Sequence, residues 1–117
     1  MTDELVAAIV KGIQEKKGHN VAIIDFRNTE GAIAHYFVCA EGNTPTQVEA
    51  IAEAIDTTVR TAVGESPAHV VGLGLSHWVA MDYIDAIVHI FVPDARHFYD
   101  LEGLWQDVPT QHLPDTY

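Results

Sequence analysis

The segment from residue 78 to residue 91, WVAMDYIDAIVHIF, constrains the fold of this chain more than any other. It contains two apolar runs, residues 79–81 and 86–92, with the polar sequence DYID between them. Two strand-like runs joined by a short polar connection are typical of an antiparallel hairpin. The second run is rich in β-branched residues and almost continuously apolar, as in strands covered on both faces. We therefore expect a hairpin whose second strand is central in a sheet.

Two amphipathic helices are predicted in the first half of the chain. Residues 2–17 repeat apolar side chains every four positions, and a glycine follows them. In residues 44–64, Thr44 and Gln47 form a capping box around a proline, and Gly64 ends the apolar periodicity. Further strands are expected at residues 21–26, 33–40 and 68–72, and a last helix at residues 94–105 with Phe98, Leu101 and Trp105 on one side.

The resulting element order is α-β-β-α-β-β-β-α. This order favours a two-layer α/β sandwich with a mixed sheet and the two longer helices on one face. With 117 residues, the chain has the length of one domain. We assign residues 1–107 to that domain and residues 108–117, which include two prolines, to a coil that becomes a flexible tail.

The composition indicates a folded protein outside the membrane. Hydrophobic residues make up 48% of the chain, yet no apolar run approaches the roughly 20 residues that span a bilayer. We therefore expect a soluble, cytoplasmic protein. The one cysteine, Cys39, lies in an apolar run and is expected to be a buried structural thiol rather than a reactive one.

The charge is strongly acidic and unevenly distributed. The formal net charge is -11, and Arg96 is the one lysine or arginine after residue 60. Binding to a phosphate backbone depends on clustered lysine and arginine, which this half of the chain lacks. We expect a basic protein surface rather than a nucleic acid as the partner, while a solvated acidic surface is the plainer explanation.

Two segments resemble the family of Iojap-related ribosomal silencing factors, RsfS. Residues 78–91 match its W-hydrophobic-D-Y-G-D-hydrophobic-V-H-hydrophobic-F segment, and RHFYDLEGLW at residues 96–105 matches R-x-F/Y-Y-x-L-E-x-L-W. Ile84 stands where the family usually has glycine, so we expect the turn backbone to differ, because β-branched residues avoid positive φ. His35 stands where the family usually has aspartate.

This resemblance implies a nucleotidyltransferase-like fold without catalysis or a cofactor. Similar proteins bind the large ribosomal subunit through ribosomal protein L-fourteen, sterically block subunit joining and so repress translation. They often form homodimers, and we expect one here. Within the hairpin we predict a partner-binding set in which Trp78 and Tyr83 are the anchors, since large aromatic side chains dominate interfaces. The full set is Trp78, Met81, Asp82, Tyr83 and Asp85.

The competing hypothesis is a diverged nucleotidyltransferase that holds Mg²⁺ with Asp82 and Asp85. Such enzymes place a Gly-Ser turn before a strand that carries Asp-x-Asp. Here the sequence is Gly74-Leu75-Ser76, and the two aspartates are three positions apart, so a regular strand would point them to opposite faces. The seven histidines are dispersed, without metal-ligand spacing. His89 lies in mid-strand and is predicted to be a hydrogen-bonded core histidine. We therefore expect no catalytic metal.

Overall fold

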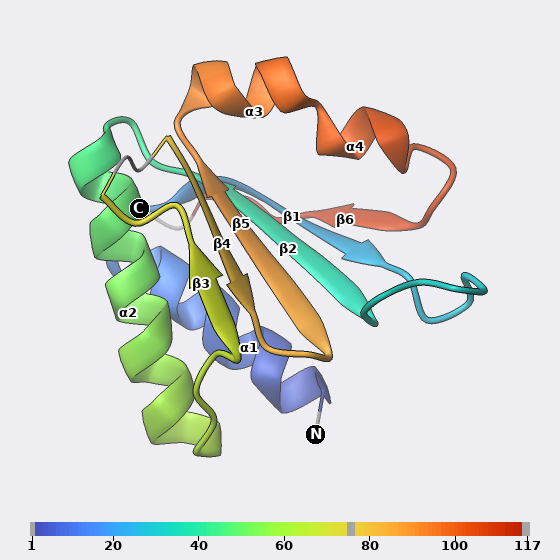
Figure 1. Ribbon diagram of the computed structural model, residues 1–117, viewed down its shortest axis with the longest axis horizontal. Helices are drawn as coiled ribbons and strands as arrows, with labels where there is room; N and C mark the ends of the chain where they lie inside the picture. The colour runs from blue at the N-terminus through green and yellow to red at the C-terminus, as the bar shows by residue number, and fades with distance from the viewer. Residues whose placement is uncertain (1, 75–76, 116–117) are drawn as a thin grey trace.

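The structure is a computed structural model that describes residues 2–74 and 77–115, and it shows an α/β fold around one mixed six-stranded sheet (Figure 1). None of the helices in these residues is both long and apolar enough to cross a membrane. In chain order the elements are α1 (Thr2–Glu15), β1 (His19–Asp25), β2 (Tyr36–Glu41), α2 (Pro45–Val63), β3 (His69–Val71), β4 (Trp78–Asp82), β5 (Ala86–Phe91), α3 (Pro93–Tyr99), α4 (Leu101–Leu104) and β6 (Thr110–His112).

The strands lie in the order β3-β4-β5-β2-β1-β6. β2 and β5 are parallel neighbours at the centre, and every other neighbouring pair is antiparallel. β4 and β5 form the predicted hairpin, and β5 has a partner strand on each side. The mixed sheet and the element order predicted from the sequence are confirmed, with one further strand, β6, at the end.

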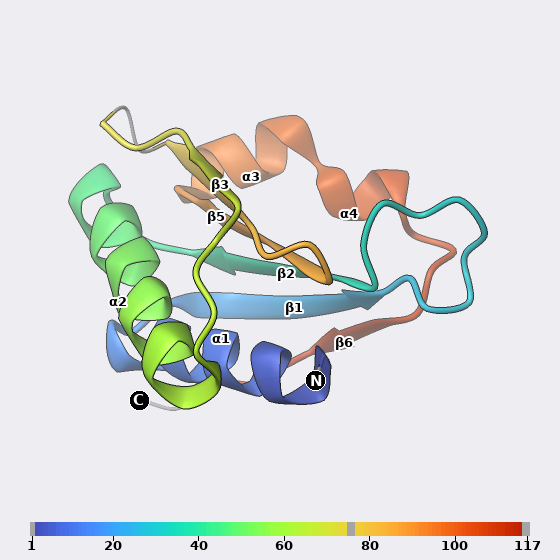
Figure 2. The same cartoon turned by 60° about the horizontal axis from the view of Figure 1, so that its bottom comes forward.

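One face of the sheet is covered by α1 and α2, which pack side by side (Figure 2). Their apolar stripes enter a core shared with alternate side chains of the central strands. The helices approach closely at Gly12, where an added Cβ would lie 2.7 Å from the Cα of Ile55. The prediction that both longer helices share one face is therefore confirmed.

The ends of α2 follow the predicted capping pattern. The backbone N–H of Gln47 donates to the Thr44 hydroxyl (3.1 Å), and the Gln47 side-chain oxygen accepts from the N–H of Asn43 (2.6 Å). Gly64 closes the helix in the left-handed conformation, with φ of 72°. The Gln47 amide also donates to the carbonyls of Lys16 and Lys17, so this cap fixes the end of α1 as well.

The other face carries α3, α4 and a smaller aromatic core. Trp105 packs edge-on against Phe26, with ring centroids 5.1 Å apart, above strand side chains that include Phe37 and Cys39. Burial raises the pKa of the Cys39 thiol to about 12, so the predicted structural thiol is confirmed.

The last helix differs from the single helix predicted at residues 94–105. Asp100 adopts a left-handed conformation (φ of 45°) and ends α3, while its carboxylate accepts from the N–H of Gly103 and begins α4. Phe98 and Trp105 are consequently not on one side: Phe98 is 77% exposed, and Trp105 packs inward. The prediction failed because the helical spacing was extended across a residue that serves as a cap.

Arg96 fixes α3 and α4 to the sheet. Its guanidinium donates to Glu102 of α4 (2.8 Å) and to Glu41 of β2 (3.0 Å), and also to the carbonyl of Asn20 in β1. The Arg96 and Glu41 side chains are each only 11% exposed. Because a buried ion pair is costly to break, this contact holds the second helical layer in one position.

β6 lies in the segment for which the sequence predicted coil. It pairs antiparallel with β1, from Ala22 to Ile24. Beyond it, the N–H of Leu113 donates to the carbonyl of Val21, and the Asp115 carboxylate accepts from the N–H of Asn20. Residues 110–112 are exposed and only three in number, so their side chains carry no alternating pattern that would predict a strand.

Candidate functional site

Strand alternation divides the predicted binding residues between two faces of the sheet. In β4, the side chains of Val79 and Met81 enter the core beneath α2, and Tyr83 follows them on that side. Trp78 and Asp82 belong to the opposite face, where the helices of the described residues are the short α3 and α4 (Figure 2). The five residues therefore do not form one continuous patch.

Met81 and Tyr83 are core residues, each 2% exposed. An anchor for a partner needs an exposed ring, but the alternation of β4 continues into the turn and directs the ring of Tyr83 toward the helical layer. Burial, reinforced by the negative charge of Asp56, raises the pKa of the Tyr83 phenol well above its usual value. Among the described residues, its buried hydroxyl has no hydrogen-bond partner.

Trp78 is held in place by three aromatic neighbours. Its indole N–H donates to Nδ1 of His89 on the adjacent strand (3.1 Å). Its ring stacks on Phe91 at a centroid distance of 5.3 Å and contacts Tyr99 of α3 at 4.5 Å. Trp78 remains half-buried, so part of the ring faces solvent while its orientation is fixed. A rigid, partly exposed aromatic side chain is well suited to anchor a protein interface.

His89 is a hydrogen-bonded core histidine, as predicted. It is 7% exposed, and desolvation lowers its pKa to about 4, so the ring is neutral near pH 7. Because Nδ1 accepts the Trp78 hydrogen bond, the proton of the neutral ring lies on Nε2. His89 therefore positions Trp78.

Asp82 and Asp85 flank a tight turn in which Ile84 takes a backbone conformation typical of glycine. Ile84 has φ of 72°, the left-handed conformation that glycine adopts readily, so it does take the positive φ that a β-branched residue was expected to avoid. The Asp82 carboxylate accepts from the N–H of Ile84 (2.8 Å), which stabilises this conformation. The Asp85 side chain is exposed, and its backbone carbonyl accepts from the N–H groups of His35 and Tyr36.

We call the uncovered area on the side of Trp78 the open face. Cross-strand neighbours share a face, and the register pairs Val71 with Ala80 and Asp82 with Ile87. Tyr99, 46% exposed, borders this area from α3, and Val71 is 62% exposed. The open face thus combines apolar groups with the Asp82 carboxylate. It consists of His69, Val71, Trp78, Ala80, Asp82 and Ile87.

Sequence reasoning missed His69, Val71, Ala80, Ile87 and Tyr99. A signal for Ile87 was available, since β5 was predicted to pair with β4, and an alternating register through Trp78 would have placed it on this face. The position of Val71 depends on the pairing of β3 with β4, and that of Tyr99 on the docking of α3. Neither has a local sequence signal.

The residues of the competing enzyme hypothesis do not meet in a metal site. Within residues 2–74 and 77–115, no group of three or more His, Cys, Asp or Glu side chains is arranged to hold a metal ion. Asp82 contributes its carboxylate to the turn, and Asp85 points to solvent. Leu75 and Ser76, which belong to the turn considered above, lie outside the described residues.

Comparison with known proteins assigns the chain to a family. The sequence pattern of the family described as "Ribosomal silencing factor during starvation" matches residues 1–116. The chain belongs to the RsfS family. It is 33% identical to ribosomal silencing factor RsfS of Halalkalibacterium halodurans over 110 residues, which cover 94% of this chain and 92% of that protein. Identity to RsfS of Bacillus subtilis is 32% over 99 residues, or 85% of this chain and 82% of that protein.

Two solved structures share the fold of this chain. A crystal structure of a protein from Bacillus halodurans superposes on this chain with a TM-score of 0.79 at 31% sequence identity. The match covers 95% of this chain and 99% of that one. A crystal structure from Chromobacterium violaceum shares the fold, with a TM-score of 0.84 at 24% identity, and covers 91% of this chain and 87% of its own. The RsfS resemblance identified from residues 78–105 extends over residues 1–116 in the family match.

Proposed function

We infer that this RsfS-family protein represses translation by binding the large ribosomal subunit and sterically blocking its union with the small subunit. The observation that carries this inference is the family match, which spans residues 1–116 and is supported by full-length relatives named ribosomal silencing factor. Such a role needs an exposed binding surface in the cytoplasm, and no turnover.

The partner we propose on the large subunit is ribosomal protein L-fourteen, contacted by the open face. Trp78 supplies a fixed aromatic anchor at one end of β4, and Asp82 and Asp85 supply negative charge at its other end, around the turn. Met81 and Tyr83 support this surface from the core beneath it. The net charge of -11 favours a basic partner, because complementary charge accelerates encounter and selects among partners.

Co-sedimentation with isolated large subunits tests this proposal. We expect the wild-type protein to co-sediment at low salt, and its absence from the subunit pellet under these conditions would contradict the proposal. The Trp78→Ala variant should lose about 2 kcal/mol or more of binding free energy, since truncated anchors typically cost that amount. Circular dichroism and denaturation would verify that the variant remains folded.

Two double variants distinguish the effect of negative charge at the hairpin from the effect of net charge. Asp82→Asn with Asp85→Asn keeps a side-chain oxygen for the turn and removes two charges near the open face. Glu4→Gln with Glu30→Gln removes two charges from exposed positions elsewhere. We expect the first pair to weaken large-subunit binding at least five-fold at low salt and the second to change it less than two-fold. Equal effects would argue against contact through the hairpin.

We also propose that the protein is a homodimer. The sheet ends in two short edge strands, β3 and β6, each paired on one side only among the described residues. Such edges are common sites of self-association. Sedimentation at micromolar concentration should show a species of about twice 12.9 kDa, and a single 12.9 kDa species would contradict dimer formation.

A further inference from the structure

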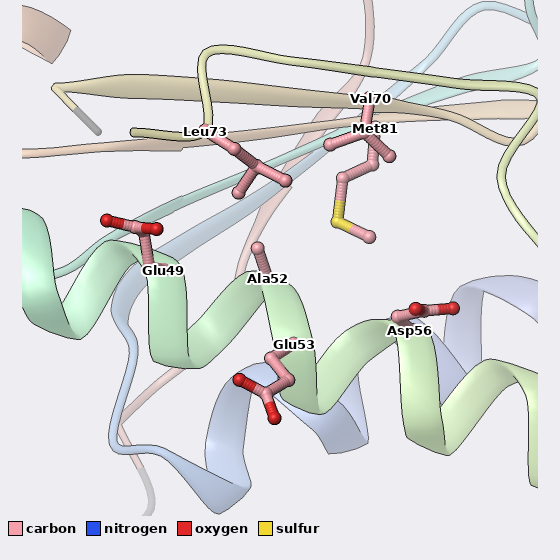
Figure 3. Close-up of a pocket in the computed structure, with 7 residues that line it drawn as sticks. All are labelled: Glu49, Ala52, Glu53, Asp56, Val70, Leu73 and Met81. Carbon is pink, nitrogen blue, oxygen red and sulfur yellow. The ribbon is translucent and has the colours of Figure 1, made fainter. Parts of the chain in front are cut away.

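A hollow of about 260 Å³ lies between α2 and β3, on the side of the sheet opposite the open face (Figure 3). Its floor is apolar and its rim is acidic. The volume is below the roughly 300–1,000 Å³ of typical small-molecule sites, and it suits one or two side chains of a partner. The floor is formed by Ala52, Val70, Leu73 and Met81, and the rim by Glu49, Glu53 and Asp56. The Glu53 carboxylate is directed away from the strands, so it lies at the outer edge of the rim (Figure 3).

The hollow arises from the sequence of α2. Positions 49, 52, 53 and 56 form one stripe along a helix, because residues three and four apart are neighbours on its surface. At the middle of this stripe, Ala52 presents only a methyl group toward the strands (Figure 3). Leu73, which follows β3, faces the same space and stays 56% exposed. The space between helix and strand is therefore lined with apolar groups that nothing in the described chain fills.

The acidic rim is only partly neutralised. Asp56 forms an ion pair with Arg60 at 2.8 Å. No cation of the described residues lies within ion-pair distance of Glu49 or Glu53. These two carboxylates are four positions apart on one helix, an arrangement in which like charges destabilise the helix. Lysine or arginine supplied by a partner would relieve that repulsion.

The strand beside the hollow offers backbone groups as well. β3 is the last strand of the sheet and pairs only with β4 among the described residues. An extended peptide can add to such an edge, with main-chain hydrogen bonds for affinity and pockets for alternate side chains. Val70 faces the hollow, so a peptide residue beside it in register would also face the hollow.

We propose that this hollow is a docking site for an extended basic segment of a partner protein, which adds to β3, inserts one aliphatic side chain over Ala52 and places flanking lysine or arginine side chains beside Glu49 and Glu53. The apolar floor distinguishes such a segment from a simple polyamine, and the acidic rim excludes a nucleic acid. The site lies on the other side of β3 from the open face, so this proposal does not depend on the ribosomal partner proposed above.

The spacing of side chains along an extended chain defines a peptide that tests this proposal. Side chains two positions apart in a strand share a face and lie roughly 7 Å apart, so a central side chain over Ala52 places its two same-face neighbours roughly 7 Å to either side. Glu49 and Glu53 are roughly 6 Å apart along the axis of α2, and the long, flexible lysine side chain can bridge the difference. In the peptide acetyl-TKTLTKT-amide, the leucine and the two lysines share one face, and the threonines favour an extended chain. Titrating this peptide into ¹⁵N-labelled protein should shift the amide signals of residues 49–56 and 69–73 at low salt.

Two further peptides test the requirements for apolar contact and for charge. Acetyl-TKTSTKT-amide should bind at least five-fold more weakly, and acetyl-TETLTET-amide should produce no shift at these residues. Equal binding of the leucine and serine peptides would overturn the proposal, because it would show adsorption of a cation without use of the hollow. Shifts confined to other parts of the protein would overturn it as well.

Two double variants test whether peptide binding depends on the carboxylates of Glu49 and Glu53 or on net charge alone. Glu49→Gln with Glu53→Gln should weaken the leucine peptide at least five-fold, and Glu4→Gln with Glu30→Gln, which has the same net charge, should change it less than two-fold. The first pair should melt no lower than the wild type, since it removes a like-charge contact from a helix surface. Equal weakening by both pairs would show that net charge alone attracts the peptide, and would overturn the proposal.

Discussion

Ile84 occupies a backbone conformation that suits glycine. Its φ of 72° costs a β-branched residue about 1–2 kcal/mol, and the side chain is 65% exposed, so little burial offsets this strain. We predict that Ile84→Gly raises the free energy of unfolding by about 1 kcal/mol, measured by urea denaturation. Glycine loses more backbone entropy on folding, which limits the gain.

Ile33 provides the control for this substitution. It is 78% exposed, and its φ is not positive. Ile33→Gly should therefore leave the free energy of unfolding unchanged or lower it by up to about 1 kcal/mol. If both glycine variants were destabilised to the same extent, the strain assigned to Ile84 would be absent.

His89 should make the stability depend on pH. Its pKa is lowered to about 4 in the folded state and is about 6.5 in an unfolded chain, so the unfolded state binds the extra proton between these values. The folded state is therefore not penalised above pH 6.5 and loses stability as the pH falls toward 4, by up to about 3 kcal/mol. Urea denaturation between pH 7 and pH 4 measures this loss.

The variant His89→Phe isolates that contribution. It should be less stable at pH 7, because the Trp78 N–H loses its acceptor, yet its free energy of unfolding should fall less steeply between pH 6.5 and 4. The difference in slope should reach up to about 1.4 kcal/mol per pH unit, the value for one proton. Parallel profiles would show that His89 does not titrate differently on unfolding.

Arg96 carries the contact between the helical element α3–α4 and the sheet. Arg96→Met leaves Glu41 without its nearest cation in a position 11% exposed, and we predict a loss of about 3 kcal/mol in the free energy of unfolding. Arg60→Met is the control, since the Arg60–Asp56 pair lies on the helix surface and contributes about 0.5 kcal/mol or less. Similar losses in both variants would contradict a structural role for the Arg96 pairs.

The same element links stability to the proposed interface. Tyr99 at the end of α3 contacts Trp78, so displacement of α3 would free the indole ring at the edge of the open face. The helical layers on the two faces of the sheet therefore cover different cores and leave different amounts of the sheet accessible. α1 and α2 cover the larger core, whereas α3 and α4 cover a smaller aromatic cluster and leave part of the sheet accessible.

The C-terminal segment adds β6 to the edge of the sheet, beside β1. Removal of residues 108–117 would delete the partner of β1, the Leu113 contact with the core and the Val108 contact with the aromatic cluster. We predict that this truncation lowers the free energy of unfolding by about 2–3 kcal/mol, mainly through lost apolar burial. The matched substitution Gln111→Ala, at an exposed position of β6, should have little effect. An unchanged stability after truncation would support the domain boundary at residue 107 that the sequence suggested.

The sequence by itself determined the contacts between residues that are near one another along the chain. The capping box of α2, its terminal glycine and the hairpin at residues 78–91 depend on side chains within a few positions of one another, and all are present as predicted. The burial of Cys39 and His89 also followed, because each lies in an apolar run long enough to imply a central strand.

The tertiary structure decided which surfaces remain free. Tyr83 is buried because α2 covers one side of β4, and Trp78 is oriented by His89 and Tyr99, eleven and 21 positions away. β6 exists because residue 112 reaches residue 22. Local sequence patterns report the period of a segment and its apolar side, but which partner covers that side depends on contacts between distant segments. Which face of the hairpin remains accessible therefore depends on how the helices pack against the sheet.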